Sequence, residues 1–349
     1  MLSFVELSGS PFQIGQALGR FGAQAAHRWL LESDVWASVM RWRGSHAATA
    51  MEGRIKQDFP RVHEELLGLA AGLELPASDV VLWNCRGDVW AMAPDGCTTV
   101  QTPLPGGARI THNEDGNPGF AGYCAMGEFM PDHGPRFASF IYPASIPGHT
   151  FAVNEHGLAM TVNNLRTRRA GQGMPRMALT RRLLDQATLE SAVQLLRDTP
   201  SAGGFHLSLA QPGRTGLLSV EFASQGVSVQ AVNAPSLHAN HALHSAMRDC
   251  PQVITMSSLQ RQRRGSQLLR AGTAPADPAS IDPLRILADR QNAEFPIYRD
   301  APDDSDAENT MATADIHIGS EHVAWQVYER PQQSTRFTFN NATLDRQGP

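Results

Sequence analysis

The residues with the clearest chemical potential lie in the stretch DGCTT, residues 95–99, where a glycine precedes a cysteine and two threonines follow it. A cysteine acts as a nucleophile when its thiolate is accessible and a base or a positive charge lies beside it. Gly96 tolerates backbone geometries that other residues avoid, so the peptide bond ahead of Cys97 can be strained and its carbonyl approached by the thiol. Attack there would form a thioester, and hydrolysis of the thioester would make Cys97 a new chain end.

A cysteine at a new chain end would carry both groups that amide hydrolysis needs. A free α-amino group has a pKa near ~7.7–8.0 and can accept a proton at neutral pH, so nucleophile and general base would share Cys97. The other cysteines, Cys85, Cys124 and Cys250, lack such neighbours and are interpreted as small core residues. The four cysteines are too few and too scattered for a disulfide framework, which predicts free thiols.

The elements that must position Cys97 show two kinds of sequence pattern, one before the cysteine and one after it. The first ninety residues read as helical, beginning with SPFQIGQALGRFGAQAAHRWLLES, in which Ser10 and Pro11 fit an N-cap and first turn. A second amphipathic run, DFPRVHEELLGLAAGLEL, ends at Pro76. Beyond Cys97, short β-branched and apolar runs broken by Gly, Pro and Asn predict strands within residues 98–103, 108–115, 136–143, 150–157 and 158–164.

The C-terminal half alternates in the same way. Residues 175–199 predict two consecutive helices, with Thr188 capping the second. The remaining predicted elements are strands at 204–211, 216–223 and 226–233, a helix over 257–270, a polar loop around 271–282, and closing strands near 310–318 and 322–328. Helices layered on sheets predict an α+β fold.

The composition and net charge of this chain limit the kinds of partner it is expected to bind. Its 349 residues are 42% apolar, which is enough for a substantial core, and its net charge is −5 with no long run of one sign. We therefore expect neither a nucleic-acid nor a membrane partner. The start MLSFVELSGSPF does not read as a signal peptide, and no window approaches about eighteen consecutive apolar residues, which predicts a cytoplasmic protein. The basic run 261–264 is interpreted as a solvated helix face, and the acidic segment 300–310 as an exposed loop.

Several motifs resemble those of the cysteine N-terminal-nucleophile hydrolases of the acyl-coenzyme A:6-aminopenicillanic acid acyltransferase and β-alanyl amine hydrolase family. The opening GSPFQIGQALG is similar to the family's GxPxxIGxxxG segment, and DGCTT to its self-processing junction. HNED falls where members carry an Asn-x-Asp element. FAVNEHGLAMTVNNL resembles the central asparagine segment, LLSVEF a glutamate-bearing strand, and HANH the Asn-His element. The matches run in order from about residue 8 to about residue 330.

The resemblance implies a four-layer αββα sandwich and an autocatalytic cut between Gly96 and Cys97. Residues 1–96 would form a helical pro-segment or small chain and residues 97–349 the catalytic chain, within one structural unit. Cys97 would be both the autoprocessing and the catalytic nucleophile. By the same resemblance, the carboxylate of Asp115 helps to hold the catalytic groups, and the carboxamide of Asn240 stabilises the oxyanion.

The positions of the weaker candidates follow from strand geometry. Asp115 lies eighteen residues beyond Cys97, a span that two short strands and the LPGG turn can fold back on itself. Glu114 should lie on the opposite face of its strand from Asp115, which favours a structural role, although it is also a candidate for substrate binding. Asn164 is the other substrate-binding candidate, and a turn role fits it or its neighbour Asn163 equally well.

Three histidines, His238, His241 and His244, raise the alternative of a zinc hydrolase. Their spacing argues against it, because on a helix the third would point away from the first two, and on a strand the middle one would face the other side. A zinc site would need a further ligand from the HNED segment. We therefore expect no metal and no cofactor.

The sequence thus predicts a self-processing cysteine amidohydrolase that cleaves a C–N amide bond of a small N-acyl or aminoacyl compound, β-alanyl compounds included, through an acyl-thioester on Cys97. Two alternatives stay open: an acyltransferase that moves an acyl group from a thioester to an amine, and an unprocessed relative that binds a small metabolite. Ala223 stands where the acyltransferase has a serine after its Glu-Phe pair, and this difference, with the stretch IYPASIPG, favours hydrolysis. The expected partners are a small amide substrate and the two processed chains for each other, with a homo-oligomer left open.

Overall fold

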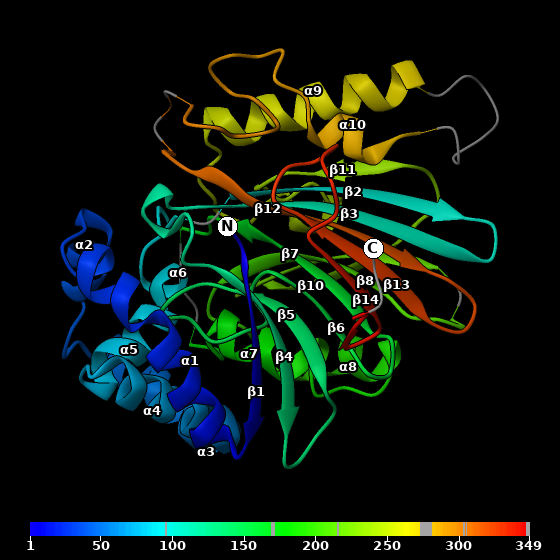
Figure 1. The fold of residues 1–349 in the computed structure, drawn as a ribbon. Coiled ribbons are helices and arrows are strands. Elements are labelled where there is room, and N and C mark those ends of the chain that lie inside the picture. The colour runs from blue at the N-terminus through cyan, green and yellow to red at the C-terminus, as the bar shows by residue number, and fades with distance from the viewer. Residues whose placement is uncertain are drawn as a thin grey trace.

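The chain folds into two β-sheets packed face to face with helices outside them, which confirms the expected α+β sandwich (Figure 1). The computed structural model describes residues 1–94, 96–168, 172–214, 216–272, 281–302, 304 and 306–346. The first sheet has eight strands in the order β1-β4-β5-β6-β7-β8-β9-β10, and the second has seven in the order β11-β2-β3-β12-β13-β14-β15. The strands are β1 (Ser3–Gly9), β2 (Gly96–Leu104), β3 (Gly107–Gly116), β4 (Ala125–Pro131), β5 (Phe137–Ile141), β6 (Phe151–Asn154), β7 (Ala159–Leu165), β8 (Gly204–Ala210), β9 (Leu217–Ala223), β10 (Gly226–Val232), β11 (Ser236–His238), β12 (Asn309–Ile318), β13 (Val323–Tyr328), β14 (Phe337–Asn340) and β15 (Thr343–Leu344).

The helices form the two outer layers and one end of the molecule (Figure 1). α9 and α10 cover the seven-stranded sheet, α7 and α8 lie outside the eight-stranded sheet, and the N-terminal helices gather at one end. The helices are α1 (Pro11–Ala25), α2 (Asp34–Met40), α3 (His46–Asp58), α4 (Pro60–Leu73), α5 (Ala77–Asn84), α6 (Arg86–Val89), α7 (Arg176–Leu183), α8 (Leu189–Asp198), α9 (Met256–Gly272) and α10 (Pro283–Leu287), with shorter turns η1 (Ala26–Leu30), η2 (Pro118–Phe120) and η3 (Ser245–Met247).

The N-terminal segment is part of the eight-stranded sheet. Its first element is the strand β1, which pairs in parallel with β4 along its whole length, from Ser3 opposite Ala125 to Gly9 opposite Pro131. The prediction that the first ninety residues are helical is wrong at this strand. Its partner lies more than a hundred residues away in the sequence, so nothing local to β1 reveals the pairing. Residues before Cys97 therefore contribute hydrogen bonds to the sheet formed by residues after it.

Helices α1 and α4 pack with their backbones almost in contact, which gives the glycines of the opening motif a physical role. A Cβ atom at Gly15 would lie 2.0 Å from the carbonyl oxygen of Glu65, and one at Gly19 would lie 2.4 Å from that of Leu69. Only glycine permits this approach. The start of α1 is as expected, because Ser10 caps it with a hydrogen bond from the Gln13 amide in a capping box.

The sequence predictions for the middle of the chain are largely confirmed. The predicted strands correspond to β2, β3, β5 to β10, β12 and β13, and Thr188 caps α8 as expected. The predictions missed β4, β11, β14, β15 and α10. Most of the predicted polar loop around 271–282 lies outside the described residues. The four cysteines all fall within the described residues, are buried and form no disulfide.

Two surface predictions are wrong. Arg261, expected on a solvated face of α9, is fully buried, and Glu308, expected in an exposed acidic loop, is also fully buried. Both side chains pack against the strand that carries Cys97. Charge runs are usually exposed to solvent because burying a charge is unfavourable. Arg261 and Glu308 can be buried because opposite charges from elements distant in the sequence lie near them.

Among the described residues, no single helix has both the length and the apolar character to cross a bilayer. Helices α4 and α5 meet those criteria only when taken together, and they are bent at 118° to each other.

Candidate active site around Cys97

The β2–β3 ribbon brings the chemically interesting residues together. The turn between its strands contains Pro105 and Gly106, and Gly106 has a φ of 75°, a combination typical of a type II turn. The resulting register pairs Cys97 with Glu114 and Gly96 with Asp115. Since paired residues project to the same side of a ribbon, the side chains of Cys97 and Glu114 share one side and that of Asp115 lies on the other.

The two sides of the ribbon face different layers. On the sheet-facing side, Thr99 donates a hydrogen bond to Oδ1 of Asn163 in β7 of the other sheet, at 2.7 Å. On the helix-facing side, the side-chain Nδ2 of Asn113 donates to the carbonyl of Leu287 in α10 at 2.9 Å. The sulfur of Cys97 therefore lies between the two sheets.

An acid–base cluster surrounds the sulfur on the sheet-facing side. Sγ of Cys97 is 3.6 Å from Oε2 of Glu114, and the same oxygen is 3.1 Å from Nε2 of His112. All three residues are buried, and burial lowers the pKa of His112 to about 3. The alternation of β3 and the register with β2 could have revealed this cluster, because His112 and Glu114 are two residues apart on one strand.

The main chain of Cys97 is held by two other side chains. Its amide donates to Oδ1 of Asn240 at 3.1 Å, and its carbonyl accepts from Nη1 of Arg261 at 2.7 Å. Nη2 of Arg261 also donates to Oδ1 of Asn240, at 2.7 Å. The structure therefore brings Asn240 to Cys97, as a group that holds the nitrogen of the cysteine, and it adds Arg261, which the sequence reasoning missed.

Asp115 pairs with Gly96 and lies on the other side of the ribbon from the sulfur. Its Oδ1 accepts from the hydroxyl of Thr310 in β12 at 2.6 Å. Burial raises the pKa of Asp115, while the positive charges of Arg261 and Arg299 oppose the rise. This carboxyl therefore lies among arginines on the helix-facing side, not beside the sulfur.

Gly96 lies against a second buried carboxyl. A Cβ atom at Gly96 would be 2.1 Å from Oε2 of Glu308 and 3.4 Å from Cβ of Asp115, so a larger residue would displace the glutamate. Burial raises the pKa of Glu308 to about 7 despite the ion pair of 3.4 Å with Arg166. The glycine of the junction is thus required by this close contact.

Asn164, the second substrate-binding candidate, holds the chain ahead of the junction. Its Nδ2 donates to the carbonyl of Ala93 at 3.4 Å, and its Oδ1 accepts from Nη1 of Arg176 at 2.6 Å. Its carbonyl accepts from Nδ2 of Asn240 at 3.3 Å. Asn164 and Glu114 are both buried.

The three histidines considered for zinc are not grouped. His238 lies 2.9 Å from Glu221, His241 lies 2.8 Å from the Ser258 hydroxyl, and His244 bonds Ser219 and Ser228. Among the described residues, the grouping whose composition also suits a metal ion is the cluster around the sulfur, whose donor atoms lie within 4.8 Å of one another. Because its members already bond one another, we describe it as an acid–base cluster, and the expectation of no metal stays a prediction.

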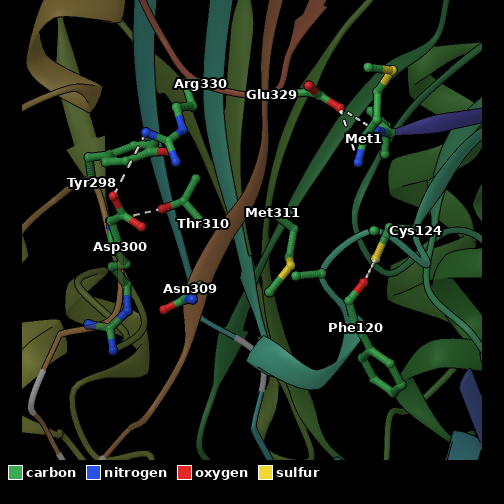
Figure 2. Close-up of a pocket in the computed structure, with 14 residues that line it drawn as sticks. Met1, Phe120, Cys124, Tyr298, Asp300, Asn309, Thr310, Met311, Glu329 and Arg330 are labelled. Atoms are coloured by element: carbon green, nitrogen blue, oxygen red, sulfur yellow. Dashed lines mark hydrogen bonds and ion pairs between the residues drawn. The ribbon is translucent and has the colours of Figure 1, made fainter. Parts of the chain in front are cut away.

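A cavity of about 260 Å³ lies near the ribbon but does not include Cys97 (Figure 2). Its wall includes Thr310, the residue that donates to Asp115, together with Met311 of the same strand and Met1 from the N-terminus. The cavity therefore reaches the helix-facing side of the ribbon at Thr310 and Arg299, which both act on Asp115.

The fold and the site define a class: a two-sheet α+β protein with a buried glycine–cysteine junction at the start of the strand β2. The chain belongs to the acyl-coenzyme A:6-aminopenicillanic acid acyl-transferase family, whose model matches residues 104–332. The matched segment contains Glu114, Asp115 and Asn240 and begins after Cys97. The role of Cys97 thus depends on its own surroundings and motif.

Two curated proteins illustrate the relationship. The beta-alanyl-dopamine/carcinine hydrolase of Drosophila melanogaster is 23% identical over 216 residues, which cover 54% of this chain and 56% of that protein. The acyl-coenzyme A:6-aminopenicillanic-acid-acyltransferase 40 kDa form of Emericella nidulans is 40% identical over 68 residues, or 19% of each chain. The match thus spans about half of the first relative's length and about a fifth of the second's.

Proposed function

We propose that the protein is a self-processing cysteine amidohydrolase that cleaves a C–N amide bond of a small N-acyl or aminoacyl compound. The observation that carries this proposal is the set of contacts at the Gly96–Cys97 junction. The Cys97 amide bonds Asn240, its carbonyl bonds Arg261 and its thiol contacts Glu114. The thiol and the nitrogen of Cys97 are thus held by different groups. This arrangement suits a residue whose thiol later acts as the nucleophile and whose nitrogen later acts as the base.

The proposed reaction starts from the chain cleaved before Cys97. The Cys97 thiolate attacks the substrate carbonyl, and the α-amine of the same residue takes the thiol proton and passes it to the leaving amine. Asn240 accepts a hydrogen bond from the α-amine, and the nearby Arg261 disfavours the protonated amine because like charges repel. Water then hydrolyses the acyl-thioester and restores the thiol.

Substrate access depends on the cut. In the intact chain Cys97 is only 2% exposed, and the segment ahead of it is anchored at Ala93 by Asn164 and Arg166. Cleavage breaks the covalent link between that anchored segment and the sulfur. Activity should therefore appear only after processing, in proportion to the cleaved fraction.

Mass spectrometry of the purified full-length protein tests this proposal. We expect two fragments separated between Gly96 and Cys97, and an intact chain for the Cys97→Ala variant. The control variant Cys85→Ala, which removes another buried cysteine, should be cleaved normally. Wild-type protein that stays whole and turns over neither aminoacyl amines nor N-acyl amino acids would exclude the enzyme and leave the small-metabolite-binding relative as the remaining candidate.

Acyl transfer is the second candidate, because the more similar relative over its matched residues is an acyltransferase. Both reactions share the acyl-thioester and differ in whether water or an amine resolves it. The β-alanyl amine hydrolase among the relatives and Ala223, found where the acyltransferase has a serine, favour water. A β-alanyl amine assayed with increasing concentrations of a second amine separates them, since transfer would give an exchanged amide in place of free acid.

A further inference from the structure

We propose that, in the intact chain, Glu114 and His112 take up the thiol proton of Cys97 and so supply the base for self-cleavage. This inference rests on the proposed function and concerns the step before any α-amine exists. The nitrogen of Cys97 is then an amide that donates to Asn240, so it has no lone pair to accept a proton. The first cut therefore needs a base other than the one used in turnover.

The direction of the hydrogen bonds begins at Asn163. Its Nδ2 donates to the carbonyl of His238 at 3.1 Å, which fixes the orientation of the carboxamide. Oδ1 is therefore turned toward the hydroxyl of Thr99 at 2.7 Å and Nδ1 of His206 at 3.2 Å. An amide oxygen has no proton to give, so both of these neighbours donate to it.

The same logic fixes the proton on His112. The one hydroxyl proton of Thr99 points at Asn163, so Oγ1 of Thr99 can only accept from Nδ1 of His112, 2.7 Å away. Nδ1 of His112 therefore carries a proton. In a neutral imidazole the other nitrogen, Nε2, then presents its lone pair to Oε2 of Glu114.

Two lone pairs facing each other at 3.1 Å would repel, so one proton occupies the contact between Glu114 and His112. Complete burial favours the uncharged arrangement, with the proton on the carboxyl and the imidazole neutral, and it lowers the pKa of His112 to about 3. The carboxyl oxygen that donates to His112 is also the one that lies 3.6 Å from the sulfur of Cys97. Thiol, carboxyl and imidazole thus form a directed chain.

Self-cleavage then proceeds without a net change in charge. The thiol proton moves to Oε2 of Glu114 as the carboxyl proton moves to Nε2 of His112, which leaves a thiolate and an imidazolium. The thiolate bonds to the carbonyl carbon of Gly96, whose π electrons form the oxyanion. When the oxyanion collapses, the C–N bond breaks, and the nitrogen takes a proton back from the Glu114–His112 pair. The products are the α-amine of Cys97 and a thioester, which water hydrolyses.

Three further titratable or charged groups of the described residues bear on this cluster. Burial raises the pKa of the Cys124 thiol, so this thiol keeps its proton. His206, across the sheet interface, has a pKa lowered by burial and by neighbouring histidines, so it is neutral. Arg261 binds the carbonyl of Cys97 and favours a thiolate there. None of these groups offers a competing acceptor for the thiol proton.

The test follows cleavage of the newly made full-length chain. The chain is produced by cell-free synthesis, shifted to buffers from about pH 6 to about pH 8, and quenched at intervals for mass spectrometry. Wild-type cleavage should vary little with pH, because the proton passes to an internal acceptor. Glu114→Gln should slow it about 100-fold or more. Its rate should rise about tenfold per pH unit, because the thiolate must form by losing its proton to solvent.

A matched control separates this role from a structural one. Glu221 and His238 form another buried carboxyl–imidazole pair, at 2.9 Å, away from the sulfur. Glu221→Gln should be cleaved at the wild-type rate with the wild-type pH profile. His112→Gln, which keeps a hydrogen-bonding group beside Glu114 but cannot take up a proton, should slow cleavage as Glu114→Gln does. In both slowed variants, turnover per cleaved chain should fall less than the cleavage rate does.

The outcomes distinguish this inference from the function on which it rests. Wild-type chains that never cleave would defeat the proposed function. Wild-type cleavage with Glu114→Gln and His112→Gln both at the wild-type rate and pH profile would defeat only the inference. If neither variant folds, wild-type cleavage in mixtures of H₂O and D₂O decides. If two protons move in the rate-limiting step, a plot of the cleavage rate against the deuterium fraction must be curved. A linear plot would overturn the proposed transfer from Cys97 through Glu114 to His112.

Discussion

The two sides of the β2–β3 ribbon bury polar groups in different ways. The helix-facing side holds formal charges: Asp115 lies near Arg261 and Arg299, and Glu308 pairs with Arg166. The sheet-facing side carries hydroxyls, amides and imidazoles whose pKa values are lowered by burial, as for His112 and His206. One side is stabilised by Coulomb attraction and the other by directed hydrogen bonds.

This difference assigns a separate task to each side. Fixed charges hold the main chain of Cys97 in place, because the guanidinium of Arg261 binds its carbonyl whatever the state of the sulfur. Neutral groups are suited to moving a proton, because a transfer between them needs little rearrangement of charge. The cysteine lies where the two sides meet, with its carbonyl bound by α9 and its thiol between the sheets.

The largest expected effect comes from removing the central cation of the helix-facing side. Arg261→Met leaves the carbonyl of Cys97 and Oδ1 of Asn240 without their guanidinium and Asp115 without one of its countercharges. Breaking a buried ionic group in this way costs about 3–5 kcal/mol. Urea unfolding should show this loss, measured in the Cys97→Ala background so that every chain is intact.

Arg264 is the matched control on the same helix. It pairs with Asp289 at 2.7 Å near the surface, where its side chain is 24% exposed. Arg264→Met should cost about 1 kcal/mol or less, because solvent screens such pairs. Equal losses from the two substitutions would mean that the helix-facing side does not depend on its buried charge.

A second effect concerns the pH dependence of stability. The pKa of Glu308 is raised by burial from 4.5 to about 7, so the folded chain binds a proton more tightly than the unfolded chain. Its contribution is fully present below about pH 4.5 and is lost as the pH rises to about 7. Wild-type stability relative to Glu308→Gln should therefore fall by roughly 3 kcal/mol across that range.

Taking the difference between wild type and variant removes the opposite trend from buried histidines. His112 and His241, with pKa values lowered to about 3 and about 4, resist protonation in the folded state and favour folding as the pH rises. The exposed pair of Glu190 with Arg214 provides the control, and Glu190→Gln should run parallel to wild type. A flat difference between wild type and Glu308→Gln would show that Glu308 is ionised throughout.

The parts of the fold that could be predicted from the sequence are those whose signals lie in neighbouring residues. The helix after Ser10 and the cap at Thr188 lie in neighbouring residues and were predicted correctly. The strand β1 needs a partner that begins at Ala125, and β4 carries a glycine and two methionines that weaken its strand pattern. These strands are specified by the assembled sheet, not by their own sequences.

The candidate site divides in the same way. Motif resemblance located Cys97, Asp115 and Asn240, and strand alternation correctly put Glu114 on the other face from Asp115. Recognising Glu114 as the neighbour of the sulfur needed the register of β2 on β3. Recognising Arg261 needed a contact between residues 164 positions apart. A basic run carries no local sign that one of its members is buried.

The smallest expected effect tests whether the sheet-facing side acts as one network. Beyond Asn163 the bonds continue through His206, Ser219 and His244 to the hydroxyl of Ser228. Ser228→Ala removes the last of these bonds and should cost about 1 kcal/mol. Gln230→Ala, at an exposed position of the same strand, should stay within about 0.5 kcal/mol of wild type.

The same variant should leave self-cleavage unchanged, for a reason found at Asn163. Its amide oxygen accepts from both arms of the network, so neither arm can pass a proton through it to the other. Ser228→Ala therefore weakens one arm without altering the protons shared by Glu114 and His112. Cleavage rates of Ser228→Ala measured across the same pH range as for Glu114→Gln provide the check. A pH profile like that of Glu114→Gln would mean that protons cross Asn163 and that the sulfur draws on the whole network.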